Sequence, residues 1–358
     1  MTGDEPTTGG DAADRVLVVR NDRLGDFVLA LPAFAMLRRS MPGLEISALV
    51  PAYTESLARA VPEIDRVVVD PGRGSGLRSL LALRAELRAR RFGGAVVLFS
   101  TGRVAAALAL AGVPYRLAPA TKPAQLFYTE RLIQRRSRSA KPEFEYNLDL
   151  VRAYLARRGI RPVAADPPFL RFADSDVQAH RVAFRHTEHL DPALRLVLVH
   201  PGSGGSAPNL DPDGYVELAT RLRSDAGHCI LVTAGPGERP LADQVAGRLE
   251  VRGVSVRVVY SAGSLAEFAR TVALADVVVG GSTGPLHLAG ALDRPTAVFY
   301  PRTRAGSSLR WRTLNREEHR LAFEPPERVR PEDVAAIDVV QAADEISRRF
   351  LGAGPAAG

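Results

Sequence analysis

The sequence predicts an α/β protein built from two doubly wound units, each with a parallel sheet. Apolar, β-branched runs alternate with helical patterns along the chain, which is typical of parallel sheets covered by helices on both faces. A length of 358 residues is too great for one ordinary core and suits two units of about 150 residues each. Each half also begins with the same order of strand, polar loop and helix.

The first unit is predicted over residues 15–165. A continuous β-branched run at 15–20 gives its first strand, a polar loop follows at 21–26, and an apolar helix is expected over 27–39. Further strands are predicted at 45–50, 66–70 and 95–99, with an amphipathic helix at 77–91. Residues 1–14 lack the basic start and apolar centre of a secretion signal and are predicted to be a disordered leader.

The second unit is predicted over residues 191–330, after a Pro-rich segment that marks residues 166–190 as a linker. Its strands are predicted at 196–200, 229–233, 255–259, 277–280 and 296–300, with a helix at 213–225. The final segment, 331–358, holds a helix expected to return and pack on the first unit, and then a disordered tail. Two such units are expected to face each other across a central cleft at the carboxyl ends of their strands, where open α/β sheets bind ligands.

Composition narrows the class of protein. No apolar run approaches the roughly 20 residues needed to cross a bilayer, so the chain is expected in the cytoplasm. A net charge of +7 suits phosphorylated acceptors or peripheral contact with an anionic inner membrane face. Nucleic acid is not an expected partner, because aromatic residues make up only 6% and no stacking motif accompanies the charges. The single cysteine, Cys229, lies in an apolar run and is interpreted as a buried structural thiol.

Asp26 is the first candidate for chemistry. It ends the polar loop after the first strand, where its carboxylate can accept a proton from an attacking hydroxyl as a general base. Taken alone, an Asp at this position is more typical of a helix N-cap. Gly25 allows a tight turn and the close approach of a ligand. The loop lacks Gly-x-Gly-x-x-Gly spacing, so a dinucleotide fingerprint is absent.

Two further loops suit a phosphate. Residues 200–206 follow the first strand of the second unit, and their glycines and hydroxyls expose backbone N–H groups, although a flexible connection is the simpler interpretation. At residues 280–289 a strand meets a helix that begins near Pro285, and the open N–H groups of that helix again suit an anion. His287 in its first turn fits the core as well as a ligand contact. Two such turns in one unit favour a diphosphate, and the turn at 233–238 either lines the nucleoside part of the site or starts a helix.

The turn at 280–289 has a rival interpretation. Gly280-x-Ser282-x-Gly284 fits the nucleophile elbow of an α/β-hydrolase, for which Asp293 and His319 are the available acid and histidine. Too little sheet follows this turn for that fold. Metal ligation is not expected, because the sequence holds no spaced Cys/His set.

Taken together, these residues resemble glycosyltransferase family 9, the ADP-heptose heptosyltransferases of lipopolysaccharide core assembly. The resemblance runs from the first strand to about Trp311. Its most specific parts are Leu24-Gly25-Asp26 followed by Leu31-Pro32, His200-Pro201-Gly202, and residues 283–289 followed by Pro295. Three positions depart from the family pattern: Pro208 and Leu210 stand near the places of a frequent Lys and a frequent Trp, and Ser282 replaces a frequent Asp.

The resemblance implies a GT-B fold, with acceptor contacts in the first unit and an ADP-sugar held mainly by the second. It implies an inverting, metal-independent transfer that needs no cofactor and uses Asp26 as the catalytic base. The residues expected to bind the donor are His200, Gly202, Ser203, Gly204, Ser206, Thr233, Gly235, Ser282, Thr283, Gly284, Pro285 and His287. Those expected to contact the acceptor, a glycan, glycolipid or small molecule, are Asn21, Asp22, Arg23 and Gly25.

Three alternatives stay open from the sequence. The same donor chemistry can serve a small soluble acceptor in natural-product biosynthesis. A GT-B-like epimerase would release a free sugar or its isomer without an acceptor. A non-catalytic binder of nucleotide sugars would hold the donor without using Asp26.

Overall fold

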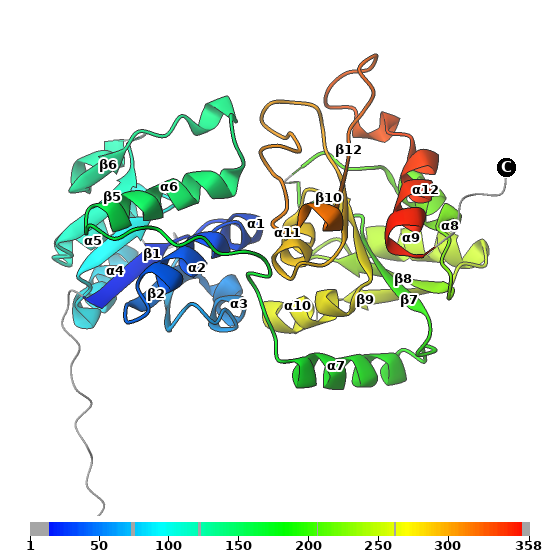
Figure 1. Cartoon of the computed structure of the whole chain (residues 1–358), viewed down its shortest axis with the longest axis horizontal. Helices are drawn as coiled ribbons and strands as arrows, with labels where there is room; N and C mark the ends of the chain where they lie inside the picture. Colours follow the sequence, from blue (N-terminus) through cyan, green and yellow to red (C-terminus); the bar gives the residue numbers. More distant parts are fainter. Residues whose placement is uncertain (1–13, 73–75, 121–122, 206, 261–262, 353–358) are drawn as a thin grey trace, which may run out of the picture. The chain divides into compact units, whose positions relative to one another are not determined.

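The computed structural model describes residues 14–72, 76–120, 123–205, 207–260 and 263–352. The chain forms two compact units, each with one six-stranded sheet (Figure 1). Unit 1 comprises Met1–Asp22, Pro32–Gln134 and Tyr146–Ala165, and unit 2 comprises Arg23–Leu31, Arg135–Glu145 and Asp166–Gly358. Two short segments of the first half of the chain therefore belong to unit 2.

Unit 1 has a sheet in which all paired strands are parallel. Its strands are β1 (Arg15–Val19), β2 (Glu45–Pro51), β3 (Arg66–Asp70), β4 (Gly94–Val97), β5 (Tyr115–Pro119) and β6 (Glu130–Leu132). The helices of this half are α2 (Leu31–Ser40), α3 (Glu55–Arg59), α4 (Leu77–Arg90), α5 (Gly102–Leu110) and α6 (Glu143–Ala156). The strand order β3-β2-β1-β4-β5-β6 is that of dinucleotide-binding folds.

Unit 2 repeats this plan, with the order β12-β11-β10-β7-β8-β9 and parallel pairing throughout. Its strands are β7 (Arg195–His200), β8 (His228–Ala234), β9 (Val256–Tyr260), β10 (Val277–Gly281), β11 (Thr296–Phe299) and β12 (Arg320–Phe323). Its helices are α1 (Leu24–Val28), α7 (Asp174–Thr187), α8 (Pro212–Arg221), α9 (Arg239–Val251), α10 (Leu265–Leu274), α11 (Gly284–Ala291) and α12 (Val339–Phe350). The α/β prediction is confirmed, since both sheets are parallel and doubly wound.

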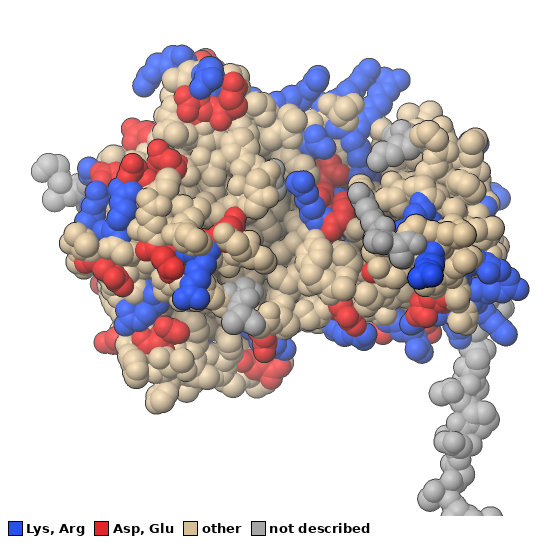
Figure 2. Space-filling view, turned by 180° about the vertical axis from the view of Figure 1, so that it is seen from behind, with Lys and Arg blue, Asp and Glu red and all other residues tan. Residues whose placement is uncertain are grey.

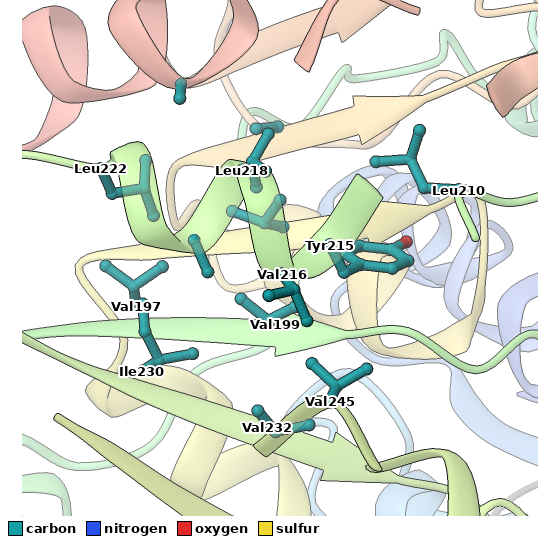
Figure 3. Close-up of a cluster of buried hydrophobic side chains, with 14 of the residues drawn as sticks. Val197, Val199, Leu210, Tyr215, Val216, Leu218, Leu222, Ile230, Val232 and Val245 are labelled. Atoms are coloured by element: carbon teal, nitrogen blue, oxygen red, sulfur yellow. The ribbon is translucent and has the colours of Figure 1, made fainter. Parts of the chain in front are cut away.

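The main core of unit 2 lies between its sheet and α8, α9 and α12. Val197 and Val199 of β7 pack with Tyr215 and Val216 of α8 (Figure 3). The buried face of α12, Ala342, Ala343 and Ile346, joins the same cluster. The final helix is therefore part of unit 2, whereas the sequence predicts that it packs on the first unit.

Several element boundaries differ from the sequence predictions. The helix expected over 27–39 is two helices, α1 and α2, because Pro32 has no N–H to donate to the carbonyl of Val28 and restarts the helix as its second residue. Residues 166–190, expected to be a linker, contain α7. The short strands β5, β6 and β12 were not predicted. The leader up to residue 13 and the tail from 353 lie outside the described residues.

The distribution of charged side chains on the surface is relevant to the binding of nucleic acid or an anionic membrane, and the length and apolarity of the helices are relevant to membrane insertion. On the face drawn in Figure 2, basic and acidic side chains are mixed, so the excess positive charge is not gathered into one patch there. In the part of the chain that the structure describes, no helix is both long enough and apolar enough to span a membrane.

Candidate active site

A pocket of about 560 Å³ opens in unit 2 at the carboxyl ends of β7 and β10. These strands are neighbours in the sheet but are separated in sequence by β8 and β9, so their connections leave in opposite directions. Such a switch point is where open α/β sheets bind ligands, and the volume is typical of a small-molecule site. The predicted site residues that line it are Arg23, Gly25, Asp26, His200, Ser203, Gly204, Gly235, Ser282, Thr283, Gly284, Pro285 and His287.

The other predicted site residues lie elsewhere. Thr233 and Gly202 do not line the pocket, but each lies against a residue that does, Thr233 against His200 and Gly202 against Glu238. Asn21 and Asp22 belong to unit 1. Ser206 lies outside the described residues.

The N-terminus of α11 forms one wall of this pocket. Thr283 is the N-cap residue, and its side chain makes no capping hydrogen bond. Its Oγ1 is buried and has no hydrogen-bond partner among the described residues. Because the N–H groups in the first turn of a helix have no partner within the helix, this wall presents open donors and a positive dipole end. It can bind an anion.

Helix α1 lies directly against this wall. A β-carbon built on Gly284 would stand 2.8 Å from Cδ2 of Leu24, and one built on Gly25 would stand 3.0 Å from Cδ2 of His287. The glycines at these two positions therefore allow α1 and α11 to approach closely. Asp26, in the first turn of α1, consequently lines the same pocket as the amides of α11.

His287 is a buried, neutral residue that lines the pocket. Only 2% of it is exposed, and burial lowers its pKa to about 4, although the nearby Asp26 carboxylate opposes this shift. Its Nε2 lies 3.5 Å from Oγ of Ser282, and its ring centroid lies 6.3 Å from that of Trp311. The imidazole can therefore make hydrogen bonds but carries no charge near pH 7.

Glu238 occupies the place where a phosphate was expected. Its Oε1 accepts a hydrogen bond of 2.6 Å from the Gly204 N–H, and its Oε2 accepts one of 3.0 Å from the Gly235 N–H. In this structure the carboxylate already satisfies the N–H of Gly204, which belongs to the loop predicted to suit a phosphate, and also that of Gly235. Gly204 reaches this geometry with a φ of 53°, a conformation that favours glycine.

His200 is held behind Glu238. Its Nδ1 lies 3.0 Å from Oγ1 of Thr233, and its Nε2 lies 3.7 Å from Oε2 of Glu238. Burial lowers the pKa of His200, against the opposing effect of the Glu238 carboxylate. His200 is therefore also neutral near pH 7.

The segment after β11 completes the pocket, and none of its residues is among those predicted from the sequence to bind the donor. Trp311 lines the pocket, and its indole Nε1 donates to the carbonyl of Ala305 at 2.8 Å. Pro301, Thr303 and Gly306 line the same side. The one signal in the sequence was the single tryptophan of the chain, placed in a loop that follows a strand.

Unit 1 has its own pocket of about 450 Å³ at its switch point, after β1 and β4. Asn21 lines it and donates through Nδ2 to Asp70, while its Oδ1 is buried without a hydrogen-bond partner. Both oxygens of Asp70 also accept from Nη2 of Arg103, at 2.5 and 2.6 Å. Asp22 does not line this pocket and instead pairs with Arg20 at 2.9 Å. The pocket offers hydrogen-bonding groups whose charges are already paired.

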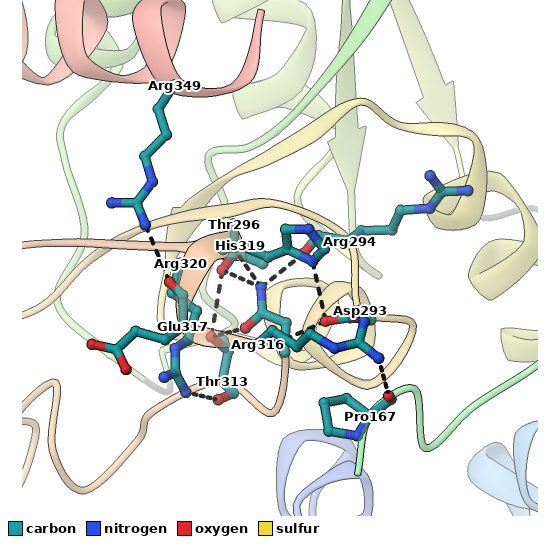
Figure 4. Close-up of polar contacts among 11 residues, drawn as sticks. Pro167, Asp293, Arg294, Thr296, Thr313, Arg316, Glu317, His319, Arg320 and Arg349 are labelled. Atoms are coloured by element: carbon teal, nitrogen blue, oxygen red, sulfur yellow. Dashed lines mark hydrogen bonds and ion pairs between the residues drawn. The ribbon is translucent and has the colours of Figure 1, made fainter.

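The hydrolase interpretation does not match the geometry. Nδ1 of His319 lies 3.2 Å from Oδ1 of Asp293, so the expected acid and histidine do meet (Figure 4). Asp293 also pairs with Arg316, however, and neither His319 nor Asp293 lines the pocket that contains Ser282. Within the described ranges, no group of three or more His, Cys, Asp or Glu side chains is placed to hold a metal ion.

Comparison with known proteins gives concordant results. The family model described as glycosyltransferase family 9 (heptosyltransferase) matches residues 81–324. A Haemophilus influenzae protein provisionally named as a glycosyltransferase is 42% identical over 313 residues, which is 87% of this chain and 90% of that protein.

Solved structures share the fold at low sequence identity. E. coli ADP-heptose lps heptosyltransferase II aligns with a TM-score of 0.77 and 17% identity over 94% of this chain and 99% of that one. A glycosyltransferase family 9 protein of Veillonella parvula aligns with a TM-score of 0.79 and 14% identity over 97% and 100%. E. coli heptosyltransferase WaaC with ADP aligns with a TM-score of 0.71 and 18% identity over 94% and 99%.

Two Rossmann-like units, each with one six-stranded parallel sheet, define the GT-B fold that the chain shares with the E. coli heptosyltransferase. The extent of the family match and the identity to the Haemophilus relative then fix its place among such enzymes. The chain belongs to glycosyltransferase family 9, the heptosyltransferase family.

Proposed function

We propose that this enzyme transfers a heptose from ADP-heptose to an acceptor hydroxyl, with inversion and without a metal. The observation that carries this proposal is the presence of the Asp26 carboxylate and the open N-terminus of α11 in one pocket. A base and an anion-binding turn are what an in-line displacement at a sugar diphosphate requires. The structures of E. coli heptosyltransferase WaaC with ADP and with an ADP-2-deoxy-2-fluoro heptose support ADP as the nucleotide.

The chemical step follows from these groups. The acceptor oxygen attacks the anomeric carbon, and Asp26 takes the proton of that hydroxyl. The bond from the anomeric carbon to the diphosphate oxygen breaks, and its electron pair leaves with the nucleotide. The amides of Thr283 and Gly284 stabilise the charge that develops on the leaving group. Displacement from the face opposite the leaving group inverts the anomeric centre.

The proposed acceptor is a glycan of the lipopolysaccharide core. Asn21 and the paired Asp70 and Arg103 in the unit 1 pocket offer hydrogen bonds suited to sugar hydroxyls. Contact with the inner membrane face would bring the enzyme to a lipid-linked acceptor, and a small soluble acceptor is the second candidate.

A mass-spectrometric assay with ADP-heptose and both kinds of acceptor tests the proposal. We expect a mass gain of one heptosyl group on the acceptor together with ADP release. Consumption of another nucleotide sugar, with ADP-heptose left intact, would refute the donor. Release of free sugar or its isomer in the absence of any acceptor would instead indicate an epimerase.

A further inference from the structure

We propose that Arg23 binds the diphosphate of the donor and supplies the positive charge that balances it during transfer. This inference rests on the proposed function. Arg23 is then a donor-binding residue, whereas the family resemblance implies that it contacts the acceptor.

The charge balance of the unit 2 pocket points to Arg23. Among the described residues that line it, Arg23 is the one lysine or arginine, and Asp26 and Glu238 are both acidic. His200 and His287 are buried and neutral near pH 7. A diphosphate brings further negative charge, which increases when the sugar leaves. A pocket with this lining needs a cation beside the phosphates, and Arg23 is available.

The position of Arg23 fits an anion at the α11 N-terminus. Arg23 is the N-cap residue of α1, and its carbonyl accepts a hydrogen bond of 3.0 Å from the Phe27 N–H. The next residue, Leu24, touches Gly284, the first residue of α11. The two helix starts therefore lie side by side, and the guanidinium and the α11 amides line one pocket.

The guanidinium of Arg23 is also available to a ligand. Its side chain is exposed and makes no ion pair or hydrogen bond with the residues that the structure describes. By contrast, Arg136 and Arg310 of the same unit both face Glu143, at 2.7 and 3.6 Å. An unpaired guanidinium can form two parallel hydrogen bonds to phosphate oxygens.

Two other backbone N–H groups in the pocket are not free to bind the phosphates. The N–H groups of Gly204 and Gly235 already donate to Glu238, so an anion there would have to displace a carboxylate. The N–H groups of Thr283 and Gly284 do not donate in any of the described backbone hydrogen bonds, and Gly284 lies against Leu24, the residue after Arg23. The diphosphate is therefore expected between α11 and Arg23.

Calorimetric titration of the full chain with ADP, AMP and adenosine tests this inference. For Arg23→Gln we expect ADP affinity to fall roughly 10- to 100-fold, because a charge-assisted phosphate contact is lost. The loss should be smaller for AMP and absent for adenosine. Arg23→Lys should recover part of it. Arg328→Gln removes an exposed arginine that does not line the pocket, and should bind ADP as the wild type does.

The outcomes separate this inference from the proposed donor. If wild-type protein binds UDP or GDP in place of ADP, and Arg23→Gln weakens that binding, the donor is wrong and the role of Arg23 stands. If ADP binds equally well to wild type and Arg23→Gln, the inference fails while the donor stands. An equal loss of adenosine and ADP affinity would also overturn it, because the effect would then not be on the phosphates.

Discussion

The α-carbon of Gly25 lies against the imidazole of His287, so that a β-carbon at position 25 would stand 3.0 Å from Cδ2 of that ring. The ring itself is buried and has little room to move. The distance between α1 and α11, and with it the position of Asp26 in the pocket, therefore depends on the absence of a side chain at residue 25.

Gly25→Ala should lower turnover while the protein stays folded. The added methyl group pushes α1 and His287 apart by a few tenths of an ångström, and small displacements of a catalytic group reduce rates steeply. We expect a loss of about tenfold in kcat, measured with a saturating donor. Gly247→Ala is the matched control, since a β-carbon there meets nothing within 4 Å and α9 should gain stability. Equal kcat in the two variants would contradict this account of Gly25.

Asp26→Asn should abolish most turnover and leave nucleotide binding nearly unchanged. The amide keeps the shape of the carboxylate but cannot accept the acceptor proton, and loss of a general base typically reduces rates by about 10²- to 10⁴-fold. Steady-state kinetics and ADP titration of the same sample separate the two effects. Asp176→Asn changes an exposed carboxylate of α7 and serves as the control. If Asp26→Asn turns over at the wild-type rate, Asp26 is not the base.

The buried His287 should make folding stability depend on pH. Its folded pKa of about 4 is below the ordinary value, so the unfolded chain binds a proton that the native protein excludes as the pH falls. The stabilising contribution is complete above the unfolded pKa of about 6.5 and is lost between there and about pH 4. From pH 7 to 5 this residue should cost about 2 kcal/mol of unfolding free energy.

Urea denaturation of wild type and His287→Gln at both pH values measures this contribution. The variant should lose less stability over the same interval, because glutamine does not titrate. Parallel losses in the two proteins would show that His287 is protonated normally in the folded state.

Glu238→Gln should loosen the loop after β7. A glutamine side chain offers one acceptor oxygen where the carboxylate offers two, so the N–H of Gly204 or Gly235 loses its partner. Hydrogen exchange at that amide should accelerate by roughly tenfold or more, as expected for a lost hydrogen bond to a charged group. Glu250→Gln, on the exposed face of α9, should leave the exchange of both amides as in wild type. Unaltered exchange in Glu238→Gln would mean that the carboxylate does not hold this loop.

Much of the site could be predicted because it depends on strand order. Loops that follow the first strand and the fourth strand of each unit, such as those at His200 and Ser282, meet at the switch point whatever the details of packing. The role of Glu238 could not be predicted from the sequence. Glu238 follows β8, and its carboxylate accepts a hydrogen bond from the N–H of Gly204 in the loop after β7, a contact that no local sequence pattern indicates. The assignment of residues 135–145 to unit 2 was equally hidden, since it depends on tertiary contacts such as the pairing of Glu143 with Arg310.

The pocket is assembled from distant stretches of chain, because residues 23–31 belong to unit 2 while the strand before them belongs to unit 1. A gene fragment beginning at Asp166 would therefore encode a second unit without Asp26, with the flank of α11 uncovered. A hybrid made by joining the front half of one relative to the back half of another at this boundary would keep both parts, but from different proteins. Each hybrid would bring together an α1 and an α11 that had never been selected to fit.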